Sequence, residues 1–376
     1  MQKKRILIFQ PALAPYMIDQ YNFLGDIFDM KLIFFYDNVP NDSFDQKKLS
    51  SQLRHSYSLL LKGGRLGKYR IFRWGVRKAI KKHKPDIILS YEFSLTTQFL
   101  ILLKRLRLIR AKIGSSIDDS LEMCLNDHSS FHRHARRYTV KHLDFITVFS
   151  DEVADFYNHN FSASDQKAIV FPILQSEERL KKETGKIEAI AQERLDKYRL
   201  EQKRVLLYVG RFSAEKGLMK FLEMVSPFLH SDPDLVFVLV GSGEEYETVK
   251  QLVASNRVED QVILPGKFEG NELYAWFLCA SGFVLPSVFE PYGAVVNEAL
   301  IFGLKVLCSR YAGSRVLVTP ANGIIFDPQN DEDTRSKLND FLTSLPKVDT
   351  NLSGKKSLTE DCNIVFLKAW QKVLSQ

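Results

Sequence analysis

Four charged side chains in the second half of the chain have the chemistry to hold a phosphorylated sugar. Two are carboxylates, Glu290 and Glu298, in the stretch LPSVFEPYGAVVNEALIFGLKVLC that begins at Leu285. A carboxylate beside a helix N-terminus can accept ligand hydroxyls while the exposed backbone N–H groups face an anion. Arg211 can donate to two phosphate oxygens at once, and Lys216 adds a point charge. The alternative is that the two carboxylates only stabilise the dipole of a helix.

Apolar strands and tight loops must position these side chains. Strands are expected over Val205–Val209, just before Arg211, and over Gly282–Leu285, just before the loop that carries Glu290. A helix is expected to begin near Gly293, and the missing Cβ of this glycine lets a ligand come close to the backbone. Open α/β sheets bind ligands beyond the carboxyl ends of their strands, so both loops are predicted to lie at a binding edge.

The motif E-P-Y-G-x-x-x-x-E after P-S, together with G-R-x-x-x-E-K-G from residue 210, resembles the retaining GT-B glycosyltransferases of family 4. The resemblance is strong over roughly 200–330 and weaker before that range. It implies an α/β GT-B fold, with two Rossmann-like doubly wound parallel-sheet domains that face each other across a cleft. It also implies that a nucleotide-sugar donor binds mainly to the second domain. The implied donor-binding residues are Gly210, Arg211, Lys216, Glu290, Tyr292, Gly293, Ala294, Val295 and Glu298.

The resemblance gives these residues distinct roles, with Glu290, Arg211 and Lys216 as catalytic groups. Arg211 and Lys216 face the donor diphosphate, where cations stabilise the negative charge that grows as the anomeric C–O bond breaks. Glu290 holds hydroxyls of the donor sugar, and Glu298 accepts both ribose hydroxyls, since a carboxylate offers two oxygens to a diol. The reaction is expected to retain the anomeric configuration, with the leaving phosphate helping to deprotonate the acceptor. Neither a metal nor another cofactor is expected.

The first half of the chain is expected to bind the acceptor. Its alternating apolar strands and helical stretches predict a parallel sheet with crossover helices. Pro15 and Tyr16 follow the first strand and either contact the acceptor or simply form a turn that caps a helix. Asp118 and Asp119 follow a later strand, where many family members carry a His close to the donor sugar. Asp118 is the candidate catalytic group of this domain and Asp119 a candidate acceptor contact. They do not form a D-x-D metal motif.

Positive charge is concentrated in the first half. Residues 1–175 contain 27 Lys and Arg against 17 Asp and Glu, whereas residues 176–376 contain 25 against 28. The segment 62–84 alone has ten Lys and Arg and no acidic residue. On a helix it would present a basic face beside an apolar stripe, which is typical of an element that contacts an anionic membrane surface. The alternative is a crossover helix with solvated charges. Nucleic acid is not an expected partner because no stacking or recognition-helix motif accompanies the segment.

Length and composition predict two domains of ordinary size in a chain of 376 residues. The expected domains cover 1–175 and 176–357, and a helix in 358–376 is expected to pack back on the first domain. The charged stretch 175–203 is predicted to be a linker followed by a surface helix. The four cysteines form no C-x-x-C pair, which fits a reducing cytosol.

The expected function is transfer of a sugar from a nucleotide diphosphate sugar, with UDP-sugar favoured over GDP-sugar. The expected acceptor is a glycan or lipid-linked molecule in surface polysaccharide synthesis. The expected location is the cytoplasm, with or without peripheral attachment to the cytosolic face of a membrane, because the N-terminal apolar run is too short for a signal-peptide core. The alternatives are an inactive GT-B relative and a basic protein that binds membrane surfaces. A P-loop is excluded because Glu215 replaces its second glycine.

Overall fold

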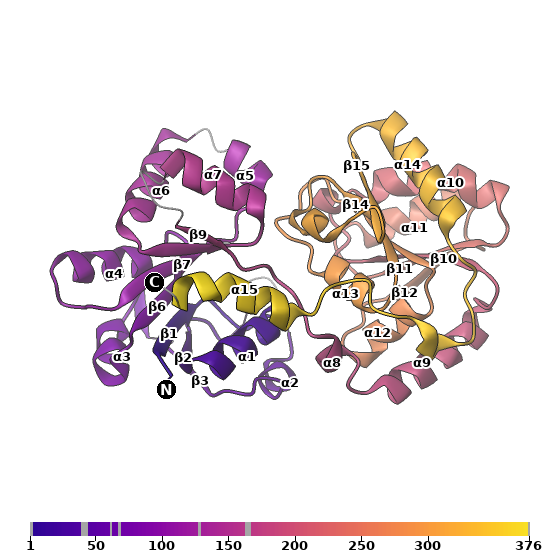
Figure 1. Cartoon of the computed structure of the whole chain (residues 1–376). Helices are drawn as coiled ribbons and strands as arrows, with labels where there is room; N and C mark the ends of the chain where they lie inside the picture. Colours follow the sequence, from indigo (N-terminus) through magenta and orange to yellow (C-terminus); the bar gives the residue numbers. More distant parts are fainter. Residues whose placement is uncertain are drawn as a thin grey trace. The chain divides into compact units, whose positions relative to one another are not determined.

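The computed structural model describes residues 3–38, 44–60, 62–66, 69–126, 129–161 and 167–374. The chain divides into two compact units. The first contains Met1–Gln175 and Cys362–Gln376, and the second contains Ser176–Asp361 (Figure 1). Each unit is built around one parallel sheet with helices on both faces.

The first unit has a seven-stranded sheet in the order β3-β2-β1-β6-β7-β8-β9, and its neighbouring strands are parallel. Its central strands are nearly continuous apolar runs, as expected of strands that are covered on both faces. The strands are β1 (Arg5–Gln10), β2 (Asp29–Phe34), β3 (Tyr57–Leu59), β6 (Ile87–Tyr91), β7 (Lys112–Ser116), β8 (Phe145–Val148) and β9 (Ala168–Val170). The helices are η1 (Pro15–Met17), α1 (Ile18–Ile27), α2 (Gln46–Ser50), α3 (Val76–His83), α4 (Leu95–Arg105), α5 (Leu121–Asn126), α6 (Ser130–His142), α7 (Asp151–Phe161) and α15 (Cys362–Leu374).

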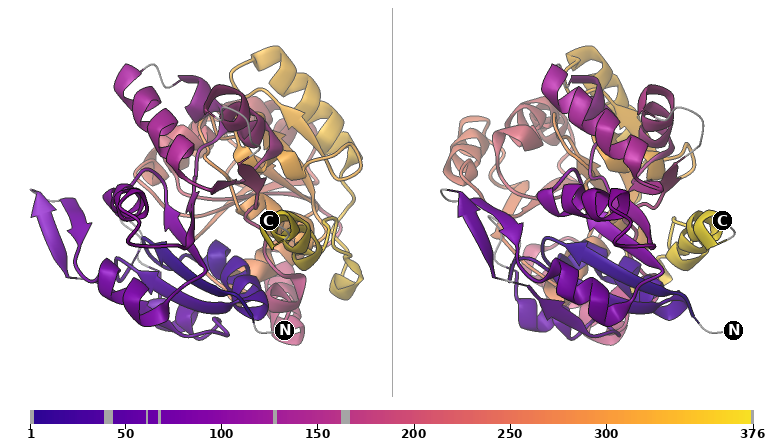
Figure 2. Two further views of the ribbon diagram at one scale, coloured as in Figure 1. Left: turned by 60° about the vertical axis from the view of Figure 1, so that its left-hand side comes forward. Right: turned by 90° about the vertical axis from the view of Figure 1, so that its left-hand side faces the viewer.

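The segment 62–84 does not form one amphipathic helix, so that prediction was wrong. Its first part is an antiparallel hairpin of β4 (Gly63–Leu66) and β5 (Tyr69–Arg73), which projects from the first unit in Figure 2. Only its second part is helical, as α3. The physical reason is the glycine content of this segment, because glycine disfavours a helix interior. Gly75, with a φ of 104°, separates the hairpin from α3. Gly67 and Lys68 lie outside the described residues.

Helix α15 is the last element of the chain, and it packs on the first unit beside α1 and β9 (Figure 1). The expected helix over 358–375 thus begins at Cys362. Phe366 and Trp370 are fully buried. The Trp370 ring packs edge-on against the rings of Phe28 and Phe171, with ring centroids 5.4 and 5.6 Å apart. A segment distant in sequence therefore completes the core of the first unit.

The second unit has a six-stranded sheet in the order β12-β11-β10-β13-β14-β15, again parallel. The strands are β10 (Arg204–Val209), β11 (Leu235–Val240), β12 (Val262–Gly266), β13 (Gly282–Leu285), β14 (Lys305–Ser309) and β15 (Gly323–Phe326). The helices are α8 (Glu177–Leu180), α9 (Thr184–Tyr198), η2 (Ala214–Lys216), α10 (Leu218–Ser231), α11 (Tyr246–Ser255), α12 (Asn271–Leu278), α13 (Val295–Ile301), η3 (Gly313–Leu317), α14 (Asp331–Ser344) and η4 (Leu352–Gly354).

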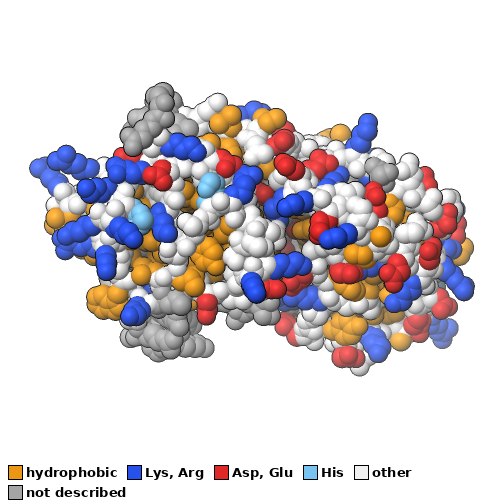
Figure 3. Space-filling model, turned by 90° about the horizontal axis from the view of Figure 1, so that it is seen from below, with side chains coloured by type: hydrophobic (Ala, Val, Ile, Leu, Met, Phe, Trp, Pro, Cys, Tyr) orange, Lys and Arg blue, Asp and Glu red, His pale blue; other side chains and the backbone are white. Residues whose placement is uncertain are grey.

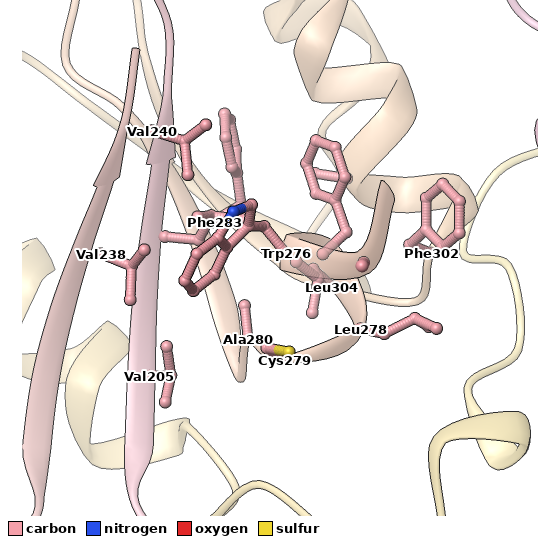
Figure 4. Close-up of a cluster of buried hydrophobic side chains, with 14 of the residues drawn as sticks. Val205, Val238, Val240, Trp276, Leu278, Cys279, Ala280, Phe283, Phe302 and Leu304 are labelled. Atoms are coloured by element: carbon pink, nitrogen blue, oxygen red, sulfur yellow. The ribbon is translucent and has the colours of Figure 1, made fainter. Parts of the chain in front are cut away.

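One apolar cluster on a face of this sheet includes Val238 from β11 and Trp276 from α12 (Figure 4). Helix α9 belongs to the same cluster. The predicted helix ahead of Val205 is therefore present, and it packs on the sheet through one face. Ile187, Ala191 and Leu195 are buried at four-residue spacing along α9. This spacing places all three on one face of the helix, so a short apolar stripe is enough to anchor a segment that is otherwise highly charged.

Candidate functional site

The loops after β10 and β13 carry most of the predicted donor-binding residues of the second unit. These two strands are neighbours in the sheet, and the strand order reverses between them, because β11 and β12 lie on one side and β14 and β15 on the other. Ligands of doubly wound sheets bind at such a switch point, beyond the carboxyl ends of the strands. The two loops thus converge where a ligand is expected.

Lys216 and Glu290 form the central ion pair of this site. The Lys216 ammonium donates to the Glu290 carboxylate, and both side chains are largely buried. The loops are also joined through the backbone, since the Glu215 carbonyl accepts from the N–H groups of Val288 and Phe289 at 2.9 and 3.2 Å. The structure therefore brings together two residues that are 74 positions apart in the sequence.

Two glycines allow the loops to pack this closely. Gly217 has a φ of 64°, and a Cβ there would lie 2.5 Å from the Pro286 carbonyl oxygen. Gly293 has a φ of 86°, and a Cβ there would lie 2.8 Å from Leu285 Cδ2 and 3.1 Å from Glu290 Cγ. Both positions combine left-handed backbone with close contacts, so no other residue fits without strain.

The other predicted donor residues lie close in sequence to Lys216 or to Glu290. Arg211 is exposed, and its carbonyl accepts a hydrogen bond from the Tyr208 hydroxyl at 2.8 Å. Tyr292 is buried, while Ala294 and Val295 are half-buried at the start of α13. Glu298 lies in the first turn of α13 and is half-buried. The helix begins at Val295, two residues after the predicted start.

The interior beneath the site is rich in acidic groups. Gly210 packs over the ring of Tyr208, because a Cβ at this glycine would lie 2.7 Å from the Tyr208 hydroxyl oxygen. Burial raises the pKa of Tyr208, and the nearby carboxylates of Glu290, Glu215 and Glu245 raise it further. Tyr208 therefore stays protonated and can keep donating to the Arg211 carbonyl, which fixes the backbone where the loop leaves β10.

Glu215 has a role that the sequence analysis did not assign. Its side chain accepts a hydrogen bond from the Ser213 hydroxyl at 2.6 Å, and its carbonyl accepts from the facing loop. Hydrogen bonds from Ser213 and from its own backbone N–H lower the pKa of Glu215. The residue stands in the quoted G-R-x-x-x-E-K-G motif, so the signal was present in the sequence, but only the fold shows that it connects two loops.

In the first unit, the two predicted carboxylates have different surroundings. Asp119 is buried, and its Oδ2 accepts from Arg136 Nη2 at 3.0 Å and from the Tyr157 hydroxyl at 2.5 Å. Its carboxylate is therefore directed into the unit. Asp118 lies beside the Tyr91 phenol, and its Oδ1 is buried without a hydrogen-bond partner. Burial raises the pKa of Asp118 to about 6, and the neighbouring Asp119 also raises it.

Pro15 and Tyr16 form the short helical turn η1 between β1 and α1. Proline occupies the first position of this turn, where its missing N–H costs nothing. Tyr16 is half-buried and close enough to Tyr91 to raise the pKa of that phenol. Tyr16 and Asp118 thus lie near the same residue, although they follow different strands.

Within the described ranges, no group of three or more His, Cys, Asp or Glu side chains is arranged to hold a metal ion. Within the same ranges, no helix combines the length and the apolar character needed to cross a membrane.

Comparisons with known proteins agree with this geometry. Residues 191–353 match the family model described as glycosyl transferases group 1. The chain is 31% identical over 181 residues to an uncharacterised glycosyltransferase of Haemophilus influenzae, covering 47% of this chain and 50% of that protein. It is 23% identical over 195 residues to the alpha-D-kanosaminyltransferase of Streptomyces kanamyceticus, covering 52% and 50%. The chain spans about half the length of these two curated relatives.

Similarity to solved structures extends over the whole chain. HepE of Anabaena in complex with UDP aligns with a TM-score of 0.71 and 15% identity, covering 99% of this chain and 100% of that one. The two parallel α/β units and this likeness define a GT-B fold, which confirms the predicted fold class. The part of the chain that matches group 1 glycosyltransferases carries the Lys216–Glu290 pair.

Proposed function

We propose that this protein is a retaining glycosyltransferase of family 4 that transfers a sugar from a UDP-sugar to a glycan or lipid-linked acceptor in surface polysaccharide synthesis. The observation that carries the proposal is the Lys216–Glu290 ion pair at the switch point of the second sheet, inside the range that matches group 1 glycosyltransferases. The UDP complex of HepE favours uracil as the nucleobase of the donor.

In the proposed reaction the second unit holds the donor. Lys216 and Arg211 stabilise the negative charge that develops on the diphosphate as the anomeric bond breaks. When the donor binds, the Lys216 ammonium can donate to its diphosphate, and the Glu290 carboxylate can accept hydrogen bonds from the sugar hydroxyls in place of Lys216. Glu298 accepts the ribose hydroxyls, and the backbone from Tyr292 to Val295 lies by the phosphates. Asp118 is the catalytic group that the first unit contributes in this proposal. No metal or other cofactor takes part.

A thermal-shift series with UDP, GDP and ADP tests the donor assignment. Ligands that bind only the native state raise the apparent melting temperature through mass action. UDP is expected to raise it most, and Arg211→Ala is expected to abolish the shift. The matched control is Arg335→Ala, since Arg335 is exposed on α14. A larger shift with GDP would change the donor, and no shift with any nucleotide would favour an inactive relative.

A second proposal, attachment to an anionic membrane surface, rests on the surface of the first unit. Trp74 is 63% exposed, directly before α3, whose residues Arg77, Lys78, Lys81 and Lys82 are exposed. Leu106 and Leu108, after α4, are also exposed. Figure 3 shows Lys and Arg side chains gathered with apolar ones on this unit. Such a combination suits a lipid interface, where Trp sits among headgroups and cations meet anionic lipids.

Vesicle sedimentation at low salt tests the membrane proposal. Vesicles with anionic lipids are expected to retain the protein, and Trp74→Ala combined with Lys78→Ala should weaken retention severalfold. Vesicles of neutral lipids are the control. Equal retention by both vesicle types, or none by either, would exclude this electrostatic attachment.

A further inference from the structure

The first unit contains a polar site around Asp118 whose ligand the proposed function does not yet name. The strand order of its sheet reverses between β1 and β6, with β2 and β3 on one side and β7 to β9 on the other. A ligand is expected beyond the carboxyl ends of β1 and β6. Tyr16 follows β1, Tyr91 and Glu92 stand at the end of β6, and Asp118 follows the neighbouring strand β7. All four are therefore at the ligand-binding edge of the first sheet.

The backbone holds Glu92 in an unfavourable conformation. Its φ is 45°, in the left-handed region that costs energy for any residue except glycine. Two hydrogen bonds keep it there: its N–H donates to the Ser116 carbonyl at 2.7 Å, and its carbonyl accepts from the Ser115 hydroxyl at 2.7 Å. Both bonds use only the backbone of Glu92, so glycine would serve the fold equally well.

The side chains at this edge have too few protons to satisfy their acceptors. The Tyr91 phenol lies close to both Asp118 and Glu92, but a phenol has one proton and can donate to only one carboxylate at a time. Asp118 Oδ1 is buried without a hydrogen-bond partner. Buried acceptors without a donor are costly, so a ligand hydroxyl that donates to this oxygen would be stabilised there.

The charged neighbours do not compensate these two carboxylates. Arg136 is close enough to favour the ionised form of Glu92, but it is hydrogen-bonded to Asp119. Among the residues that the structure describes, neither Glu92 nor Asp118 forms a salt bridge. Burial, together with the charges of Asp118 and Asp119, raises the pKa of Glu92 to about 7. The site is thus locally acidic, although the unit around it is basic.

We propose that Glu92 and Asp118 together bind two hydroxyl groups of the acceptor sugar, and that this sugar is a neutral glycoside. The inference rests on the proposed glycosyltransferase function and names the acceptor class of the first unit. Two carboxylates on one edge can accept from a diol, as a single carboxylate does for a ribose. An acceptor with a carboxylate or phosphate on this ring would meet like charge and an unsatisfied acceptor, so the site discriminates against it.

Binding of octyl glycosides, below their critical micelle concentrations and with UDP present, tests the proposal. The neutral probes are the octyl β-D-glucoside, galactoside and mannoside, and the anionic probe is octyl β-D-glucuronide. By calorimetry at pH 7.5, at least one neutral probe is expected to bind about tenfold more tightly than the glucuronide. Glu92→Gln and Asp118→Asn should each weaken that binding about tenfold and leave UDP affinity unchanged. Asp155→Asn, an exposed acid on α7, is the matched control.

The stability of Glu92→Gly separates a binding role from a structural one. Because glycine relieves the left-handed backbone, this variant should melt at the same temperature as wild type or higher, while losing neutral-glycoside binding. A melting temperature lowered by several degrees in both Glu92→Gly and Glu92→Gln would make Glu92 a structural residue and overturn the inference. Wild-type protein that binds UDP but no neutral glycoside would also overturn it, and would leave the proposed donor site intact. Protein that binds neither would overturn both.

Discussion

The two units share one architecture but differ in the charged groups at the ligand-binding edge of their sheets. Each has a parallel sheet whose strand order reverses once, and each has its polar residues in the loops beside that reversal. In the second unit a cation and a carboxylate meet there, Lys216 and Glu290, and two glycines draw the loops together. In the first unit the carboxylates of Glu92 and Asp118 lie near the Tyr91 phenol, and among the described residues neither carboxylate forms a salt bridge.

This difference teaches what each site can bind. A site with a lysine and an arginine suits the diphosphate of a nucleotide sugar, because fixed cations stabilise its charge. A site of carboxylates and phenols suits a neutral polyol, because it offers acceptors and repels anions. The net charge of the two halves of the chain shows the reverse distribution, since the first half is basic and the second is not. The charge of a whole unit therefore does not predict the charge at its ligand-binding edge.

The largest expected effect concerns the completion of the first unit by α15. Trp370→Ala should lower the free energy of unfolding by about 3–5 kcal/mol, because it empties a fully buried indole site between Phe28 and Phe171. Hydrogen exchange should show lost protection in the first unit while the second stays protected. Equal loss in both units would mean that they do not unfold separately. Lys368→Ala, in the same helix and exposed, is the control.

The next effect tests the cation of the second unit. Lys216→Ala should reduce sugar transfer about 10²–10³-fold, which is typical when one charge-stabilising group is removed from a transition state. Glu298→Gln is also expected to abolish transfer without unfolding the protein. Rates are measured by release of the nucleoside diphosphate, and Lys250→Ala on α11 is the matched surface control. Near-normal turnover in either site variant would contradict the donor assignment.

A smaller effect tests the close packing of the loops in the second unit. Gly293→Ala should destabilise the protein by about 2–3 kcal/mol, because left-handed backbone and a clash with Leu285 act together. Gly185→Ala is a contrasting control, since Gly185 lies in helix α9 with nothing within 4 Å of an added Cβ. That change should be neutral or stabilising by about 0.5–1 kcal/mol in a denaturant titration. Equal stability of both variants would show that the loop tolerates a Cβ.

The smallest effect concerns the acidic edge of the first unit. The pKa of Glu92 is raised to about 7 in the folded state, so between its unfolded pKa and pH 7 the native protein binds more protons than the unfolded chain. The free energy of unfolding therefore decreases as the pH rises from the unfolded pKa of Glu92 to about 7. Glu92→Gln should stabilise the protein by about 1 kcal/mol at pH 7.5, where the wild-type carboxylate is charged, a figure reduced because Glu92 is only partly buried. Near pH 4, where the carboxyl is protonated, the substitution should have little effect. A stabilisation independent of pH would show that charge is not the cause.

The expected strands, and the loops that follow β10 and β13, could be predicted from the sequence because they depend on local patterns. Continuous apolar runs predicted the buried strands, and the spacing of Glu290 and Glu298 with Arg211 and Lys216 predicted a donor site. The segment 62–84 was misread because its charges and aromatics fit a helix, whereas its glycines favour a hairpin. Helix α9 was expected as a surface helix, but its buried face, which includes Ile187, Ala191 and Leu195, was not identified because the segment is highly charged.

By itself, the sequence determined the repeating α/β pattern and the residue types of the second site, since periodicity and motif spacing are properties of the chain. Only the tertiary structure decided that Asp119 turns inward to Arg136 and Tyr157, while Asp118 and Glu92 lie near one phenol. It also decided that Glu215 joins two loops and that Trp370 enters the core of the first unit. These outcomes depend on contacts between residues far apart in sequence, and burial among those contacts decides which side chains remain available to a ligand.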